Sequence, residues 1–269
     1  MTANGDVAEA LTFAGRLADA ARPIALAHFR TAAAAANKDS AGFDPVTEAD
    51  TGIEAELRAL IAAHRPEDGI LGEEGEPKAS RSGLTWVLDP IDGTRAFIAG
   101  LPSWTVLIAL QDENGPQLSI IDQPFTGERF SGVAGEAAWL DQGGARHTLR
   151  VDARAETVET AIVSTTDPGL FTAAEAAAFD EIARRAKVRR YGLDAYAYAM
   201  LALGGLNLVV ESGLKPWDAA ALIPVVTGAG GIITDWSGRP CHGGGQVVAA
   251  ATPALHAAAL ARLAGAAAP

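Results

Sequence analysis

Sulfur chemistry is nearly absent from the sequence, because Cys241 is the only cysteine among 269 residues. An intrachain disulfide is therefore excluded, and a reducing cytoplasm is the expected location. Basic residues are also few: 21 lysines and arginines stand against 33 acidic residues, which gives a net charge of −12. Such a diffuse negative field disfavours nucleic acid and anionic membranes, so neither is expected as a partner.

Long apolar runs and several well-known motifs are missing as well. The longest uncharged run near the C-terminus, residues 219–234, contains Pro224 and three glycines. It is shorter than the ~18–20 apolar residues that a membrane span needs. The first residues lack a basic region followed by an apolar core, so no signal peptide is expected. No Walker A loop, G-x-S-x-G elbow or H-E-x-x-H motif is present, which removes the enzyme classes that they mark.

What the chain does contain is a change of pattern near residue 150. Apolar residues make up 49% of it, enough for a sizeable core. Helices at 6–36, interrupted near Pro23, and at 47–64 precede a meander of short strands, whereas later strands and helices alternate. The expected organisation is an α+β half at 1–150 packed on an α/β half at 151–269. Strands are predicted at 69–72, 84–88, 104–111, 117–123, 128–134, 136–140, 160–164, 188–191, 206–211, 231–234 and 246–249, and further helices at 172–186, 194–203, 217–228 and 253–265.

Carboxylates gather at turns where apolar strands end or helices begin. A buried carboxylate without a partner costs several kcal/mol, so these acids need a cation or a helix N-terminus. Arg95, Lys38 and Lys215 are the only basic residues nearby. Oxygen donors without thiols or imidazoles suit Mg²⁺ or Mn²⁺. The stretches are "DPVTEAD" (44–50), "LGEEG" (71–75), "LDPIDGT" (88–94), "VVESG" (209–213) and "KPWDAA" (215–220).

The stretch "LDPIDGT" is the most informative of the five. Asp89 and Asp92 are spaced as if one turn apart, so both carboxylates can face one point, and the Ile91 carbonyl could add a third oxygen. Gly93 permits a tight turn, after which the backbone N–H groups would open a helix and offer an anion site. Cations beside an anion cradle predict a metal-dependent phosphate site, and metal ions would make an acidic cleft attractive to phosphate.

With these motifs the chain resembles the inositol monophosphatase superfamily of Mg²⁺-dependent phosphomonoesterases. The resemblance rests on "VTEAD" (46–50), "GEEG" (72–75), "DPIDGTRAF" (89–97) and "GLKPWDAAALIPVVTGAGGIITDWSG" (213–238), in that order. Within the superfamily, "RRYGLDAYAYAMLALGGLNLVVESGLKPWD" (189–218) looks most like histidinol-phosphate phosphatases. Gly192–Ala195 departs from the small-residue "GSAA"-like stretch of inositol monophosphatases. The implied fold is the layered αβαβα sugar-phosphatase fold, usually assembled as a homodimer.

The resemblance also implies roles for particular residues. Asp50 and Thr94 match the pair that positions and deprotonates the attacking water, and Glu74 would assist them. Each has a plainer alternative: Asp50 as a first-turn acid, Thr94 as an N-cap and Glu74 as a solvated side chain. Two or three Mg²⁺ ions are implied per site, and Mn²⁺ would also fit. Their matching ligands are Glu73, Asp89, Asp92, Asp218 and the Ile91 carbonyl.

Specificity is expected from the second half. Histidinol phosphate carries an ammonium and an imidazole, for which Asp194 and Glu211 are suitable acceptors. Asp194 could instead cap helix 194–203, and Glu211 could be a solvated strand end. Arg190 could touch substrate or a dimer mate, and Lys38 could approach the phosphate or be a plain surface lysine. The substrate-binding set comprises Asp92, Gly93, Thr94, Arg190, Asp194, Glu211 and Asp218.

The expected activity is Mg²⁺-dependent hydrolysis of a small phosphate monoester, with L-histidinol phosphate as the first choice of substrate. One alternative is an inositol-1-monophosphatase or a broad sugar-phosphate phosphatase. The other is a catalytically silent binding protein of the same fold.

Overall fold

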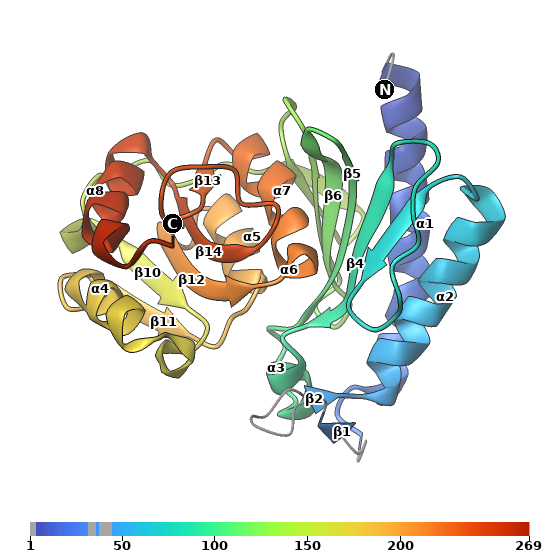
Figure 1. Cartoon of the computed structure of the whole chain (residues 1–269), viewed down its shortest axis with the longest axis horizontal. Coiled ribbons are helices and arrows are strands. Elements are labelled where there is room, and N and C mark those ends of the chain that lie inside the picture. The colour runs from blue at the N-terminus through green and yellow to red at the C-terminus, as the bar shows by residue number, and fades with distance from the viewer. Residues whose placement is uncertain (1–3, 32–35, 38–44, 269) are drawn as a thin grey trace.

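The chain folds into five alternating layers of helix and sheet. The computed structural model describes residues 4–31, 36–37 and 45–268. In order across the molecule lie α1 and α2, a seven-stranded sheet, the helices α5 to α7, a five-stranded sheet, and the pair α4 and α8 (Figure 1). This arrangement confirms the predicted layered α/β fold.

The outer helical layer of the first half consists of α1 (Asn4–His28) and α2 (Glu48–His64). The predicted interruption near Pro23 is wrong, because α1 continues through this proline. A helical proline removes one backbone hydrogen bond. Here Leu17, Ala21 and Ala25 are fully buried, so tertiary packing offsets that loss. The predicted end at residue 36 is also wrong, since α1 stops at His28.

The first sheet has the strand order β3-β4-β5-β6-β7-β8-β9. β3 and β4 are parallel, and every later neighbour in the sheet is antiparallel. The strand predicted at 136–140 begins three residues later, and the strand after it was not predicted. The bounds are β3 Gly69–Gly72, β4 Thr85–Asp92, β5 Thr105–Asp112, β6 Gly115–Gln123, β7 Glu128–Val133, β8 Trp139–Gln142 and β9 Ala145–Thr148.

The second sheet has the order β11-β10-β12-β14-β13. The predicted helix 217–228 is two helices that are separated at Ala221. Pro224 has no N–H to bond the Ala220 carbonyl, which favours this break. The strands are β10 Ile162–Thr165, β11 Val188–Tyr191, β12 Leu208–Leu214, β13 Ile232–Thr234 and β14 Gly245–Ala250. The helices are α3 Thr94–Ile98, α4 Ala173–Ala183, α5 Tyr196–Ala202, α6 Pro216–Ala220, α7 Leu222–Gly228 and α8 Pro253–Leu263, and the short β1 Ala36–Asn37 pairs with β2 Pro45–Val46.

The middle layer holds the two halves together. Tyr198, Leu201 and Val225 of this layer belong to one apolar cluster with Leu107 of the first sheet and Val209 of the second. A second cluster fills the space between the first sheet and its outer helices, and a third does so for the second sheet. The seam between the halves is therefore a packed core rather than a linker. Among the described helices, none combines the length and apolarity that crossing a membrane requires.

A buried ion network ties α1 to the first sheet. The fully buried carboxylate of Asp122 accepts two hydrogen bonds from Arg22, at 2.7 and 2.8 Å, and one from Arg129 Nε at 2.6 Å. Arg129 also donates to Asp19 of α1 at 2.7 Å. Charge-assisted bonds of this kind are shorter and stronger than neutral ones.

Replacing Asp122 with asparagine should lower the free energy of unfolding by about 3 kcal/mol, because two arginines lose a buried anion. Urea unfolding followed by circular dichroism measures the difference. A loss below about 1 kcal/mol would show that the network acts as an ordinary surface pair.

Candidate metal centre

A β-bulge brings the two aspartates of β4 to one side of the sheet. Asp89 pairs with Leu107 of β5, but Asp92 pairs with Thr105, so the register shifts between the two acids. In a regular strand, residues three apart face opposite sides. The extra residue in the bulge cancels that alternation. The predicted convergence therefore occurs, although through a strand that continues to Asp92 rather than through a helical turn.

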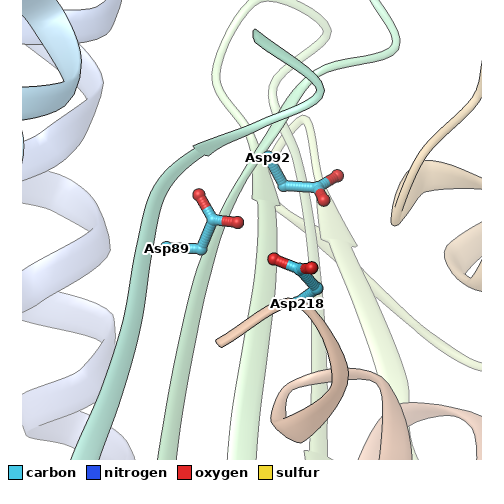
Figure 2. Close-up of side chains that lie close together, drawn as sticks. All are labelled: Asp89, Asp92 and Asp218. Atoms are coloured by element: carbon cyan, nitrogen blue, oxygen red, sulfur yellow. The ribbon is translucent and has the colours of Figure 1, made fainter. Parts of the chain in front are cut away.

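Asp218 of α6 completes a cluster of three carboxylates. Oxygen atoms of Asp89, Asp92 and Asp218 lie within 4.8 Å of one another. Figure 2 shows the three side chains converging from β4 and from the helix on the other side of the seam. Asp218 Oδ2 accepts the Lys215 N–H at 2.7 Å, which holds it at the first turn of α6. Asp92 Oδ2 accepts the Ala195 N–H at 2.7 Å, which joins β4 to the second half.

The electrostatics of this cluster favour a bound cation. Burial, together with repulsion from Glu73, raises the pKa of Asp89 well above its ordinary value, and burial also raises the pKa of Asp92. Burial raises the pKa of Asp218 to about 7. Within the described part of the chain, Asp89 Oδ1 is buried and receives no hydrogen bond. A hard divalent cation would supply the missing partner and cancel the repulsion, so the donor set fits Mg²⁺ or Mn²⁺.

All the predicted metal ligands line one cleft of about 530 Å³ between the halves. Glu73 enters from the loop after β3, and Ile91 from the bulge. The Ile91 carbonyl accepts the Thr94 hydroxyl at 3.0 Å, which leaves a second lone pair for another partner. Thr94 is the first residue of α3 rather than its N-cap, because the cap position belongs to Gly93.

Asp50 and Glu74 lie beside the cleft rather than in its lining. Thr47 caps α2, and the Asp50 carboxylate accepts both its N–H, at 2.9 Å, and its hydroxyl. The charge of Asp50 contributes to the raised pKa of Asp89, and that of Glu74 to the raised pKa of Asp50 itself. Asp50 is thus a capping-box acid that stands close to the carboxylate cluster.

Asp194 does not cap α5, so that alternative is wrong. The cap is Ala195, without a side-chain hydrogen bond, and Asp194 itself has a left-handed backbone with φ of 49°. Its carboxylate lies so close to Gly93 that a Cβ added there would stand 3.1 Å away. Burial raises the pKa of Asp194 to about 6, against the opposing charge of Arg95.

Glu211 is buried rather than solvated, so the strand-end alternative is also wrong. It accepts hydrogen bonds from the Thr166 N–H at 2.6 Å, from the Thr166 hydroxyl at 2.9 Å and from the Thr165 hydroxyl at 3.2 Å. Burial nevertheless raises its pKa to about 8. Glu211 therefore holds a proton readily until a cation approaches.

Some lining residues were not predicted, and some predicted residues lie elsewhere. Thr166 lines the cleft although no motif marked it, and Ser212 lines it although only Glu211 was predicted from the stretch "VVESG". Tyr198 faces it while the Tyr196 hydroxyl donates to Glu128 at 2.8 Å, as expected for opposite sides of one helix. Arg190 is exposed on the edge strand β11 and does not line the cleft. Lys38 lies outside the described residues.

The chain belongs to the inositol monophosphatase family, whose sequence model matches residues 6–267. Together with the carboxylate cluster, this defines a phosphatase of a metal-dependent class.

Two curated relatives are close in sequence. A protein of Arabidopsis thaliana, "Bifunctional phosphatase IMPL2, chloroplastic", is 41% identical over 225 residues, which are 83% of this chain and 63% of the plant protein. The matched region thus spans less than two thirds of that relative. The histidinol-phosphatase of Chlorobaculum parvum is 36% identical over 78% of this chain and 80% of its own length.

A solved structure of an inositol monophosphatase from Zymomonas mobilis has the same fold. It superposes with a TM-score of 0.84 and 40% identity, covering 95% of this chain and 98% of the other. Relatives named for histidinol phosphate and for inositol phosphate are therefore both close to this chain.

The raised pKa of Glu211 predicts a pH-dependent stability. Its pKa increases from 4.5 to about 8 on folding, so its ionisation opposes the folded state as the pH rises between those values. Replacing Glu211 with glutamine removes this penalty. Between about pH 5 and pH 8, the stability of the variant relative to the wild type should rise by at least about 1.4 kcal/mol.

Urea unfolding of the EDTA-treated proteins at both pH values measures this difference. Glu136→Gln, an exposed control in the turn between β7 and β8, should change in stability with pH as the wild type does. If the free energy of unfolding changes equally between the two pH values in the wild type and in Glu211→Gln, the result contradicts a raised pKa at Glu211.

Proposed function

We propose that the protein is a Mg²⁺-dependent phosphomonoesterase whose preferred substrate is L-histidinol phosphate. The observation that carries the metal-dependent part is the cluster of Asp89, Asp92 and Asp218, with its buried and unpartnered carboxylate oxygen. Family membership supports phosphatase chemistry, because the close relatives are phosphatases.

The chain would hold Mg²⁺ through the side chains of Glu73, Asp89, Asp92 and Asp218 and the Ile91 carbonyl. Bound there, the metal would neutralise the phosphate and the leaving alkoxide and would lower the pKa of the attacking water. The protein need not supply a nucleophile, since phosphoryl transfer depends mainly on positioning and charge neutralisation.

The other residues of the cleft orient the reactants. Thr47 fixes the Asp50 carboxylate through Oδ2, and this carboxylate would accept a proton from the attacking water. Thr94 would orient the same water through its hydroxyl, with Glu74 assisting Asp50. The backbone N–H groups of Gly93 and Thr94 would bind a phosphate oxygen. Gly93 is suited to this because its φ of 80° requires glycine.

The substrate proposal rests on the acids of the second half. Asp194 and Glu211 both line the cleft beyond the carboxylate cluster, and each has a pKa raised by burial. An ammonium or imidazolium group beside them would favour the ionised form of both. A neutral polyol such as inositol offers no such charge. Inositol 1-phosphate remains the second candidate, because the Zymomonas mobilis enzyme is close in structure.

The proposal extends to a homodimer in the cytoplasm, on the resemblance to the family and on the lone cysteine. A catalytically silent binding protein is the competing explanation. The presence of every expected metal ligand in one cleft argues against it.

Phosphate release should require the carboxylate cluster. Replacing Asp89 with asparagine removes a metal ligand and should lower kcat/KM more than ~100-fold, since even partners of metal ligands cost 10–100-fold when mutated. EDTA should abolish the activity of the wild type, and added Mg²⁺ should restore it. A malachite-green assay of several phosphate monoesters measures both effects.

The control is Asp180→Asn on the exposed face of α4, which should retain wild-type activity. Activity that survives EDTA, or a fully active Asp89→Asn protein, would remove the metal-dependent mechanism.

The substrate proposal is tested by comparing two esters in one variant. Replacing Asp194 with asparagine keeps the left-handed backbone accessible but removes the charge. It should lower kcat/KM for histidinol phosphate at least ~10-fold while leaving that for para-nitrophenyl phosphate within about twofold, because only the leaving group of the first ester carries positive charge. Equal losses would remove the role of Asp194, and a wild type that hydrolyses only inositol 1-phosphate would overturn the choice of substrate.

A further inference from the structure

A buried carboxylate of α2 accepts hydrogen bonds from the loop that carries Glu73. Glu54 is 2% exposed in its side chain, and both of its oxygens are occupied. Oε2 accepts the Glu74 N–H at 2.8 Å, and Oε1 accepts the Gly75 N–H at 2.8 Å. These are the first two backbone donors after Glu73, so Glu54 binds the loop directly behind that side chain.

Arg58, one turn further along α2, binds both Glu54 and the same loop. Its Nε donates to Glu54 Oε1 at 2.7 Å. Its two terminal nitrogens donate to the carbonyls of Gly75 and Glu76, each at 2.9 Å. Glu54 thus binds the N–H groups of the loop, and Arg58 binds its carbonyls. We call Glu54 and Arg58 the α2 clamp.

The two glycines that flank Glu73 and Glu74 are a consequence of this clamp. A Cβ at Gly72 would collide with the Glu54 carboxylate, and a Cβ at Gly75 would lie 2.9 Å from the Arg58 guanidinium. Neither glycine has a positive φ. A side chain at either end of "GEEG" would therefore displace the clamp, although the backbone conformation would accept one.

The clamp also links two parts of the site. Asp50 lies one turn before Glu54 on the same helix, with its carboxylate fixed by Thr47. The α2 helix is rigidly packed, since Ile53, Leu57 and Ile61 are fully buried. One helix therefore fixes the position of Asp50 and, through Glu54, the position of the loop that brings Glu73 to the cleft.

From these contacts we infer that Glu54 and Arg58 are positioning residues that set the affinity of the cleft for its divalent cation by holding the Glu73 loop. The inference rests on the proposed metal-dependent function. Neither residue lines the cleft, so both act through Glu73 rather than on the substrate. Groups that orient metal ligands typically change metal affinity 10–100-fold when they are replaced.

The test measures metal binding directly on the full-length protein. Mn²⁺ is titrated calorimetrically, without substrate, into the wild type and into Glu54→Ala, Glu54→Gln and Arg58→Ala. Glu54→Ala should weaken Mn²⁺ binding at least ~10-fold. Glu54→Gln keeps one carbonyl acceptor for the loop, so its affinity should lie between those of the wild type and Glu54→Ala.

The matched control is Asp122→Asn, which also removes a buried carboxylate bound by arginine but lies in the network between α1 and the first sheet. Circular dichroism establishes that each variant is folded at the titration temperature. Asp122→Asn should bind Mn²⁺ within about twofold of the wild type. If it loses as much affinity as Glu54→Ala, general destabilisation explains the loss and the inference is overturned.

Asp89→Asn separates this inference from the proposed function. If Asp89→Asn loses Mn²⁺ binding while Glu54→Ala and Arg58→Ala retain wild-type affinity, the clamp has no positioning role, and the metal site stands. If the wild type itself binds no Mn²⁺, the proposed function fails, and the inference fails with it.

Discussion

The repulsion between three closely spaced carboxylates, one buried and two half-buried, is the constraint around which the rest of this molecule is arranged. Carboxylate oxygens of Asp89, Asp92 and Asp218 lie within 4.8 Å of one another, and burial disfavours the ionised form of each residue. Hydrophobic packing alone would drive such groups apart. They stay together because other contacts fix the backbone that carries them. These contacts are the bulge of β4, the capping box of α6, and the hydrogen bond from Ala195 to Asp92. The stability of the rest of the fold offsets the unfavourable free energy of holding these carboxylates together, and a bound divalent cation would reduce that free energy.

The five-layer architecture explains why such a cluster can be built at all. The first sheet and α2 contribute Asp89, Asp92 and the Glu73 loop, whereas Asp218, Asp194 and Glu211 come from beyond the seam. The middle helical layer shares its apolar core with both sheets, so the two sets cannot drift apart without opening that core. The carboxylate cluster lies at the end of β4, and the lining also contains Asp194, beside Gly93, and Glu211, on β12.

Much of this arrangement was predictable from the sequence. Acids beside turn residues, with few bases nearby, predicted a shared cation, and the predicted metal ligands do line one cleft, with Asp50 and Glu74 beside it. The β-bulge was not predictable, because a strand's pairing partner decides where its alternation breaks. The continuation of α1 through Pro23 depended on packing that no local pattern shows. For the break at Ala221, Pro224 is a local signal that the prediction of one helix over 217–228 did not use. The left-handed backbone of Asp194 and the burial of Glu211 likewise arise from contacts between distant segments. The contacts of the α2 clamp were not predictable for the same reason, since nothing in the local sequence distinguishes Glu54 from the other acidic residues of its helix.

A structure of crystals grown with Mn²⁺, with data collected at its absorption edge, tests the central claim most directly. The account predicts anomalous density between the carboxylates of Asp89, Asp92 and Asp218, with Glu73 and the Ile91 carbonyl turned towards it. Fully formed crystals in saturating Mn²⁺ that show no anomalous density among these oxygens, or density only at other acids, would contradict it.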